Sequence, residues 1–251
     1  MPLKIAVLVK QVPDMNAVKV DKATRAPNLS GQQVASSYDL YAVEQALKLQ
    51  EQHGGETVAI AVGPASVKEA LNRALAMGID RAILVETADP NAVDTLALAG
   101  VIAQQVGAFS PDIVLAGQTA DDYESGQVGA QVAELLNLPL VSNIAALEVD
   151  GSTLRLKRDM EDGYQSVEVQ TPAVLLSSTG LEEPRLPSLK GIMAAKKKTV
   201  DIVSASPEAG RVTWSAPLAP EKGSAGIIVQ DVSAAEAAQR LVEWLQSEKL
   251  L

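Results

Sequence analysis

The first 140 residues alternate short apolar runs with longer stretches in which apolar positions recur every three or four residues. The short runs are "KIAVLVK", "TVAIAV", "RAILVE" and "DIVLAG", and the longer stretches are "DLYAVEQALKLQEQ", "SVKEALNRALAMG", "NAVDTLALAGVIAQQVG" and "GQVGAQVAELLN". Continuously apolar strands need burial on both faces, and the helical stretches between them supply the cover. The pattern therefore predicts an α/β fold, a mostly parallel sheet with helices on both faces.

Three of the predicted helices begin with a capping signal. Asp39 is predicted to be the N-cap of the first long helix, because aspartate accepts hydrogen bonds from the free N–H groups of a first turn. Ser66 with Glu69, and Ser233 with Glu236, have the spacing of a capping box. These signals predict helix starts near residues 39, 67 and 234.

The pattern changes after residue 140. Asp-Gly pairs at 150–151 and 162–163 separate alternating runs, which predicts an antiparallel hairpin section joined to the parallel sheet. From residue 184, proline and charge increase, and long periodic patterns vanish until "VSAAEAAQRLVEWLQ". We therefore divide the chain into an α/β domain, residues 1–183, and a C-terminal arm, residues 184–251, whose irregular part lies along the domain or along a second chain.

Composition excludes several classes of function. The 251 residues are 47% apolar, enough for a folded core, and the net charge of -10 argues against a nucleic-acid partner. The chain has no cysteine and one histidine, which removes disulfides, thiolate nucleophiles, iron-sulfur clusters and histidine-based triads. No window approaches the roughly 18 apolar residues of a membrane helix. We expect a soluble protein of the cytoplasm.

The stretch "GQTADDYESGQVGAQVAELL", residues 117–136, joins the end of an apolar strand to the start of a helix. Ligands of open parallel sheets bind at this edge, where helix N-termini point their free N–H groups. Ser125, Gly126 and Gly129 allow a phosphate to approach the backbone closely. Asp121 and Asp122 can accept hydrogen bonds from a ribose or an amide, cap the turn, or hold a metal ion. The alternative is that Asp and Gly only form the turn.

Two nucleotide fingerprints are absent from the sequence. No G-x-G-x-x-G follows the first strand, and no G-x-x-x-x-G-K-[ST] occurs, so an ordinary dinucleotide dehydrogenase or P-loop NTPase lacks its phosphate loop. A nucleotide-sized site without an obvious catalytic group is typical of a binding or carrier protein. We predict no catalytic residue and no metal site.

Several stretches together resemble the beta subunit of electron-transfer flavoprotein. "VLVKQVPD", "SYDLYAVEQALKL", "ALAMGIDRAILV" and "GQTADDYESGQVGAQVAELL" occur in the order and spacing of that family, and "EEPRLPSLKGIMAAKKK" is similar to its arm. The resemblance covers roughly residues 3–203. Leu156 departs from the family's hairpin signature, where a smaller residue is usual. The positions that match this signature are Arg158, Glu161, Asp162, Gly163, Gln165, Val167, Pro172 and Val174.

The resemblance implies a Rossmann-like fold of the adenine nucleotide alpha hydrolase type and a heterodimer with an alpha subunit. Such a heterodimer accepts electrons from flavin dehydrogenases and passes them to a quinone oxidoreductase or a similar acceptor. FAD is held mainly by the alpha subunit. A second nucleotide lies inside the beta subunit: AMP in the simple carriers, and another FAD in electron-bifurcating members, whose complexes oxidise NADH. We favour AMP.

The resemblance also implies an inner nucleotide site within residues 1–183. The family often has Asn-Pro and an aromatic residue where this chain has Ser36, Ser37 and Tyr38. Tyr38 then packs near the flavin of the alpha subunit, or alternatively against the helix that begins at Asp39. The residues carried over to the site are Leu8, Ser36, Ser37, Tyr38, Asp39, Ala59, Ala61, Gln118, Thr119, Ala120, Asp122, Ser125, Gly126, Gln127 and Val128.

In the arm, Leu189 matches the position of a leucine that anchors this family to its dehydrogenase partners. Apolar neighbours beside a lysine run suit the docking of an acidic partner, whereas the alternative is a solvated charge cluster. We further expect part of the arm and the helix from Ala234 to Gln246 to pack against the alpha subunit. The predicted docking residues are Leu189, Ile192, Met193, Lys196, Lys197 and Lys198.

Two hypotheses from other classes stay open. One is an adenine-nucleotide sensor related to universal stress proteins, in which the arm forms a homodimer. The other is an enzyme that activates a substrate with ATP, using Asp121 and Asp122 on Mg²⁺. The missing phosphate loop makes the ATP-dependent enzyme the weaker alternative.

Overall fold

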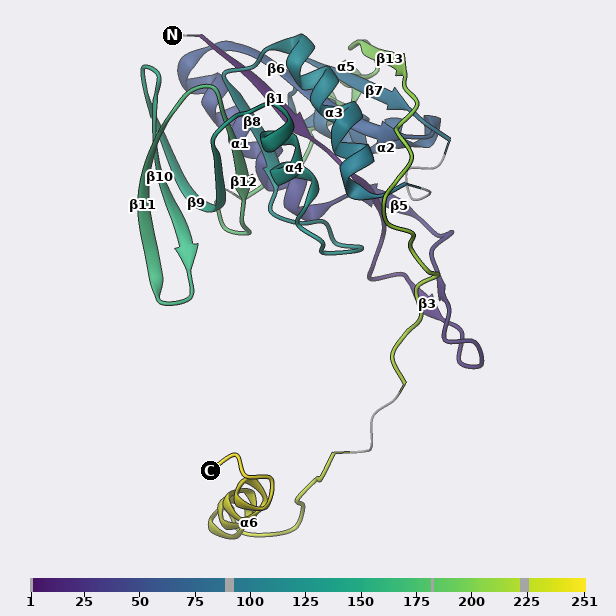
Figure 1. The fold of residues 1–251 in the computed structure, drawn as a ribbon, viewed down its shortest axis with the longest axis vertical. Coiled ribbons are helices and arrows are strands. Elements are labelled where there is room, and N and C mark those ends of the chain that lie inside the picture. The colour runs from purple at the N-terminus through teal and green to yellow at the C-terminus, as the bar shows by residue number, and fades with distance from the viewer. Residues whose placement is uncertain (1, 89–92, 182, 222–225) are drawn as a thin grey trace.

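A computed structural model describes residues 2–88, 93–181, 183–221 and 226–251. Its centre is a nine-stranded sheet with the order β11-β10-β9-β12-β8-β1-β6-β7-β13 (Figure 1). The strands from β9 to β13 in this order are parallel, and β10 and β11 extend the sheet by antiparallel pairing beyond β9. The strands are β1 Leu3–Leu8, β6 Gly55–Gly63, β7 Arg81–Glu86, β8 Ile113–Gly117, β9 Leu140–Asp150, β10 Thr153–Met160, β11 Gly163–Gln170, β12 Ala173–Ser177 and β13 Val200–Ser204.

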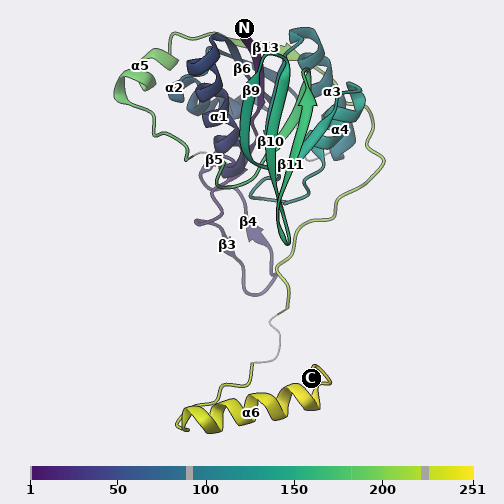
Figure 2. The ribbon, with the colours of Figure 1, turned by 90° about the vertical axis from the view of Figure 1, so that its left-hand side faces the viewer.

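Helices cover both faces of the parallel strands (Figures 1 and 2). Alternate side chains of β1 divide between the two faces: Ile5 and Val7 pack with α1 and α2, and Ala6 and Leu8 pack with α3 and α4. The period of two along a strand produces this division. The helices are α1 Ser37–His53, α2 Lys68–Met77, α3 Thr95–Phe109 and α4 Val128–Leu135, with a 3-10 turn η1 at Ala65–Val67 before α2. The predicted Rossmann-like α/β fold is confirmed.

Two of the three predicted capping signals are wrong. Ser36, not Asp39, occupies the N-cap position of α1, and the Asp39 carboxylate is directed to strand ends instead. Ser66 lies inside η1, and α2 begins without a side-chain cap. The third signal is confirmed, since Ser233 Oγ accepts the N–H of Glu236 at 3.2 Å. The spacing of Ser66 and Glu69 did not reveal that a 3-10 turn at residues 65–67 precedes α2.

A protrusion follows β1 and was not predicted. It contains two short ribbons, one of β2 Gln11–Pro13 with β5 Gln33–Ala35 and one of β3 Lys19–Val20 with β4 Pro27–Asn28. Figure 1 shows it extending from the domain on the side of β5. Strands of two or three residues are too short to show a period in the sequence.

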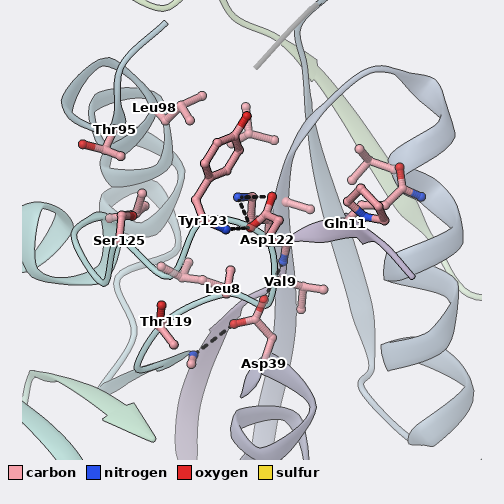
Figure 3. Close-up of a pocket in the computed structure, with 18 of the residues that line it drawn as sticks. Leu8, Val9, Gln11, Asp39, Thr95, Leu98, Thr119, Asp122, Tyr123 and Ser125 are labelled. Atoms are coloured by element: carbon pink, nitrogen blue, oxygen red, sulfur yellow. Dashed lines mark hydrogen bonds and ion pairs between the residues drawn. The ribbon is translucent and has the colours of Figure 1, made fainter. Parts of the chain in front are cut away.

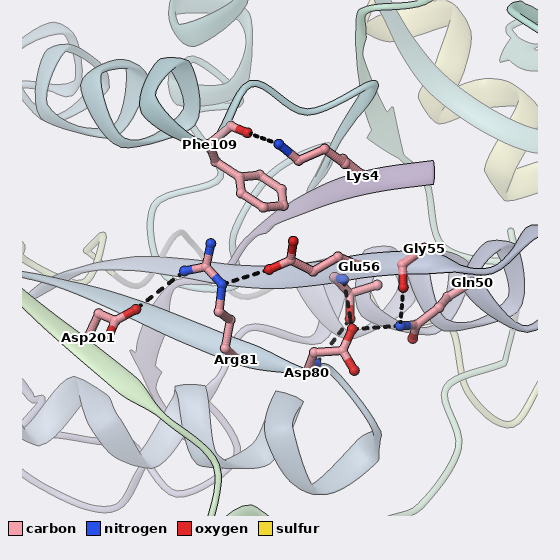
Figure 4. Close-up of polar contacts among 9 residues, drawn as sticks. Lys4, Gln50, Gly55, Glu56, Asp80, Arg81, Phe109 and Asp201 are labelled. Atoms are coloured by element: carbon pink, nitrogen blue, oxygen red, sulfur yellow. Dashed lines mark hydrogen bonds and ion pairs between the residues drawn. The ribbon is translucent and has the colours of Figure 1, made fainter. Parts of the chain in front are cut away.

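The first part of the arm folds onto the domain. Helix α5, Leu189–Ala195, packs on α2, and β13 adds a parallel edge strand beside β7. Arg81 in β7 pairs with Glu56 of β6 at 2.8 Å and with Asp201 of β13 at 3.3 Å, which ties the edge strand to the sheet (Figure 4). The sequence pattern did not predict β13, because its five residues follow a lysine run and are half exposed.

The last part of the arm behaves differently. Helix α6, Ala234–Ser247, has no buried residue and lies apart from the domain in both views (Figures 1 and 2). Its exposed side chains include Leu241, Val242 and Trp244. No helix within the described ranges is long and apolar enough to cross a membrane.

Candidate functional site

A cavity of about 570 Å³ opens at the carboxyl ends of β1, β6 and β8 (Figure 3). This is the edge of a parallel sheet where ligands bind. The loop of residues 118–127 and the start of α3 line one side, and the protrusion of residues 11–33 lines another. The arm returns to the mouth of the cavity with Trp214 and Pro217. The end of β6 and the turn that follows it, residues 60–67, also line the cavity, which is thus built from segments that lie far apart in the sequence.

Most of the site residues carried over from the family line this cavity, and four do not. Ser36 and Ser37 lie at the start of α1, and Tyr38 packs its Cβ against Gly117. Ala59 is fully buried in the sheet and belongs to the core under α1 and α2. The residues that line the cavity are Leu8, Asp39, Ala61, Gln118, Thr119, Ala120, Asp122, Ser125, Gly126, Gln127 and Val128.

The two adjacent aspartates of the loop bind groups of this chain. Asp121 accepts the N–H of Ser37 at 2.7 Å and its hydroxyl at 2.6 Å. Asp122 forms an ion pair with Lys10 Nζ at 2.7 Å and accepts the N–H of Tyr123 at 2.9 Å. Both carboxylates therefore fix the loop to β1 and α1. In the described parts of the chain, no group of three or more acidic, histidine or cysteine side chains is placed to hold a metal ion.

The N-termini of α3 and α4 lie side by side but differ in capping. Asp94 caps α3 by accepting the N–H of Ala97 at 2.9 Å. At α4, Gln127 occupies the N-cap position without a side-chain cap, because its Oε1 accepts the Thr95 hydroxyl at 2.8 Å instead. The preceding Gly126 has a φ of 61°. Within the described residues, the first N–H groups of α4 therefore have no side-chain cap, and they lie at the positive end of the helix dipole.

Gly129 serves packing as well as access to the cavity. A Cβ at this position would lie 2.5 Å from Cδ2 of Leu176 in β12. The sequence interpretation assigned this glycine to phosphate approach alone. Its close contact with the sheet positions the start of α4 beside the cavity.

Thr119 places a buried hydroxyl on the cavity wall (Figure 3). Its Oγ1 has no hydrogen-bond partner among the residues that the structure describes. A buried hydroxyl without a partner costs about 1 to 3 kcal/mol. A polar ligand in the cavity would supply the missing partner.

Asp39 is buried where β1 and β8 end. Its carboxylate accepts the N–H of Lys10 at 2.7 Å and the N–H of Gly117 at 3.0 Å. Burial raises the pKa of Asp39 to about 7, although these two donors and the charge of Lys10 act to lower it. The nearby charge of Asp121 adds to the rise. The cavity therefore contains an acid that titrates near neutral pH.

Sequence reasoning missed two side chains at the mouth of the cavity, Lys10 and Trp214, which both lie near the ring of Tyr123. Lys10 Nζ lies 5.1 Å from the ring centroid of Tyr123, and the ring of Trp214 lies 6.0 Å from the same ring. Lys10 follows directly after β1, so the strand-end rule could have identified it. No sequence signal connects Trp214 to residues some ninety positions earlier.

The predicted docking residues of the arm divide into two groups. Leu189 is 82% exposed and Met193 70% exposed, and Ile192, Lys196 and Lys197 are also exposed. Helix α5 itself is fixed, since Ala195 is buried and a Cβ on Gly191 would lie 2.4 Å from the carbonyl oxygen of Ala76. These exposed side chains form an apolar patch bordered by lysines on a fixed helix.

Lys198 differs from the predicted docking group. Its ammonium donates to the carbonyl oxygens of Leu75, Gly78 and Ile79 at 3.1, 2.9 and 2.6 Å. Burial lowers the pKa of Lys198. The side chain therefore caps the C-terminus of α2 instead of facing a partner.

Comparison with known proteins identifies the class of this fold and site. The sequence matches the electron transfer flavoprotein domain over residues 29–208. It is 38% identical to the electron transfer flavoprotein subunit beta of Syntrophomonas wolfei over 98% of this chain and 97% of the relative. The corresponding subunit of Thermoanaerobacterium thermosaccharolyticum is 39% identical over 81% of this chain and 79% of the relative.

A third relative is named as part of a reductase complex. It is the "Caffeyl-CoA reductase-Etf complex subunit CarD" of Acetobacterium woodii, 31% identical over 99% of this chain and its own full length. The chain belongs to the electron transfer flavoprotein beta-subunit family. It is an electron-transfer flavoprotein subunit, and this membership disfavours the sensor and the ATP-dependent enzyme.

Proposed function

We propose that the chain is the beta subunit of a cytoplasmic, heterodimeric electron carrier and holds AMP in the cavity of Figure 3. FAD bound mainly by the alpha subunit supplies the electron-carrying chemistry. The heterodimer takes electrons from flavin dehydrogenases and delivers them to a quinone oxidoreductase or a similar acceptor. The side chains of this subunit bind and orient, and none acts as an acid, base or nucleophile.

The observation that carries the AMP proposal is the uncapped start of α4 at the cavity wall. Residues Ser125 to Val128 would meet the phosphate with backbone N–H groups and the helix dipole. The unpartnered hydroxyl of Thr119 would bond the ligand on the same wall. Apolar side chains such as Leu8 and Ile60 border the remaining volume, as expected for a base.

Two surfaces support a partner-dependent function. The apolar patch of α5, with Leu189 at its centre, is bordered by Lys196 and Lys197, so dehydrogenase docking should weaken as salt concentration rises. Helix α6 exposes apolar side chains, among them Leu241 and Trp244, that this chain does not cover. We propose that the alpha subunit covers α6.

A second candidate ligand is FAD, as in electron-bifurcating members. The observation that favours it is that the cavity also reaches apolar side chains of the protrusion. These side chains are Met15, Val18, Pro27 and Leu29.

The nucleotide that the purified heterodimer releases on denaturation tests both candidates. One FAD and one AMP per heterodimer is the expected result. Two FAD per heterodimer would replace AMP by the bifurcating alternative. A complex that releases no adenine nucleotide beyond the FAD of the alpha subunit would overturn the nucleotide assignment to this subunit.

Thr119→Val provides a sharper test of the site. The variant keeps the shape and removes a hydroxyl that has no partner in the described chain, so the ligand-free subunit should be at least as stable as the unchanged one. AMP affinity should fall about three- to tenfold, because one hydrogen bond to the ligand is lost. Thr153→Val, whose hydroxyl lies on the exposed hairpin beside Gln170, is the control and should bind AMP as the unchanged protein does.

A further inference from the structure

A segment of the arm crosses the mouth of the cavity and is attached at both ends. At its first end, one carboxylate oxygen of Asp94 accepts the backbone N–H groups of Arg211 and Val212. The other oxygen of Asp94 caps α3 through the N–H of Ala97. Gly210 fits closely there, since a Cβ would lie 2.9 Å from the backbone nitrogen of Asp94. One side chain thus joins the arm to the helix that borders the cavity.

The middle of the segment contributes to the cavity wall. Trp214 and Pro217 line the cavity, and the Trp214 ring lies 6.0 Å from the ring of Tyr123, tilted by 37°. Tyr123 belongs to the loop that leads to α4, and the Lys10 ammonium lies near its ring. The arm therefore meets the nucleotide loop through an aromatic contact directly over the site.

The second end of the segment is attached to the protrusion. The N–H of Ala219 donates to the carbonyl oxygen of Arg25 at 2.9 Å, and Arg25 pairs with Glu221 at 3.1 Å. Figure 1 shows the arm passing from the side of β5 toward β3. Residues 210–221 thus bridge two walls of the cavity, α3 on one side and the protrusion on the other.

We propose that residues 210–221 form a strap that retains the nucleotide, and that Trp214 is the residue of the strap that holds the ligand in place. The attachments are few and Trp214 is 46% exposed, so the strap opens without unfolding the domain. A nucleotide that contacts the closed strap stabilises it, and its release requires opening. The proposal rests on the proposed function for the class of ligand, an adenine nucleotide.

The rate of nucleotide exchange in the heterodimer tests the strap. The complex is loaded with radiolabelled AMP, chased with unlabelled AMP, and the retained label is followed with time. Trp214→Ala should release AMP roughly tenfold faster, because the aromatic contact that favours the closed strap is lost. Trp214→Phe should restore slow release, and Tyr164→Phe on the exposed hairpin strand β11 is the control that should leave the rate unchanged.

Asp94→Asn tests the attachment separately from the helix cap. Asparagine keeps one side-chain oxygen for the N–H of Ala97 and is itself a good N-cap. Its amide NH₂ group cannot accept hydrogen bonds from the N–H groups of Arg211 and Val212. The strap therefore loses its attachment to α3, while α3 stays capped. We expect a roughly three- to tenfold faster release.

The outcomes separate the strap from the proposed function. If the heterodimer retains AMP but both Trp214→Ala and Asp94→Asn exchange it at the unchanged rate, the strap is overturned and the nucleotide site stands. If the unchanged heterodimer retains no AMP on loading, the AMP assignment fails. If it releases FAD on denaturation instead, the chase uses FAD, and the same rate ratios are expected.

Fluorescence gives a readout that does not depend on exchange. The chain has two tryptophans, so Trp244→Phe leaves Trp214 as its only one. In this variant subunit, AMP should protect Trp214 from quenching by acrylamide. Quenching that is identical with and without saturating AMP would show that the ligand does not contact or order the strap.

Discussion

Helix α1 carries two buried carboxylates that are held in opposite ways. Glu44 lies in the middle of the helix. It accepts hydrogen bonds from the guanidinium and the backbone N–H of Arg185, a residue at the start of the arm. Asp39, in the first turn, accepts hydrogen bonds from two backbone N–H groups. Among the residues that the structure describes, a cation contacts the Glu44 carboxylate directly and none contacts that of Asp39.

The two carboxylates therefore have different roles, Glu44 in holding the arm and Asp39 in the response to pH. The Glu44–Arg185 pair fixes the start of the arm to the domain, and Glu51 adds a second, exposed carboxylate to Arg185. Asp39 faces the cavity, where Lys10 lowers its pKa and Asp121 raises it, but burial is the largest effect. The arm-facing part of α1 should therefore govern stability, and its cavity-facing end should govern the response to pH.

Arg185→Ala should have the largest effect on stability. The substitution leaves Glu44 buried without its cation, and we expect a loss of about 3 kcal/mol in the free energy of unfolding at pH 7. This value is at the low end for buried pairs, because the Arg185 side chain is 34% exposed and partly screened. Urea unfolding of the isolated subunit measures the loss.

The variant also tests whether contact with a cation explains the comparison. Without Arg185, Glu44 stays buried and loses its guanidinium, so the loss of stability should be several times larger than for an exposed ion pair. Arg240→Ala is the matched control, because its ion pair with Glu236 is exposed on α6 and is expected to contribute at most about 0.5 kcal/mol. Equal losses in the two variants would contradict the assigned role of Glu44.

Asp39→Asn should change the pH dependence of stability. The folded-state pKa of about 7 lies above the ordinary value of 3.8, so the folded state binds the proton more tightly than the unfolded state does. The resulting stabilisation is complete below pH 3.8 and is lost as the pH rises through 7. Between pH 5 and 8 the unchanged subunit should lose about 2 to 3 kcal/mol from this group.

The measurement is a series of urea unfolding curves from pH 5 to pH 8 for both proteins. The difference between Asp39→Asn and the unchanged subunit isolates residue 39, since the other titrating groups are common to both. The stability of the unchanged subunit relative to the variant should fall as the pH rises. A difference that is constant with pH would mean that Asp39 does not titrate in this range.

The sequence predicted the elements that repeat, and it predicted a ligand site at the sheet edge where the structure has a cavity. The parallel strands, the helices between them and the hairpins at 150–151 and 162–163 are confirmed, because each has a period or a turn residue that local physics requires. The loop from Gln118 to Val128 was identified for the same reason, since it joins a strand end to a helix start.

Contacts between distant segments could not be predicted. Asp39 looked like a helix cap, but its acceptors are used by strand ends that are near only in the folded chain. Lys198 looked like part of an exposed run until α5 and β13 brought it to the end of α2. Trp214 lies in an irregular stretch, so nothing local connects it to Tyr123. In each case the tertiary contact overrides the local pattern.

Glu51→Gln should have the smallest effect and sharpens the comparison within one ion-pair group. Glu51 shares Arg185 with Glu44, but its side chain is 57% exposed, whereas that of Glu44 is 3% exposed. Arg185 lowers the pKa of Glu51, so the contact stabilises the fold above the ordinary pKa of 4.5. This stabilisation is lost as the pH falls through the lower folded-state pKa.

The effect of Glu51→Gln should be small, because solvent screens an exposed pair and Arg185 keeps its bonds to Glu44 in this variant. We expect at most about 0.5 kcal/mol in urea unfolding at pH 7, with no change in arm attachment. A loss as large as that of Arg185→Ala would show that the exposed carboxylate, and not the buried one, holds the arm.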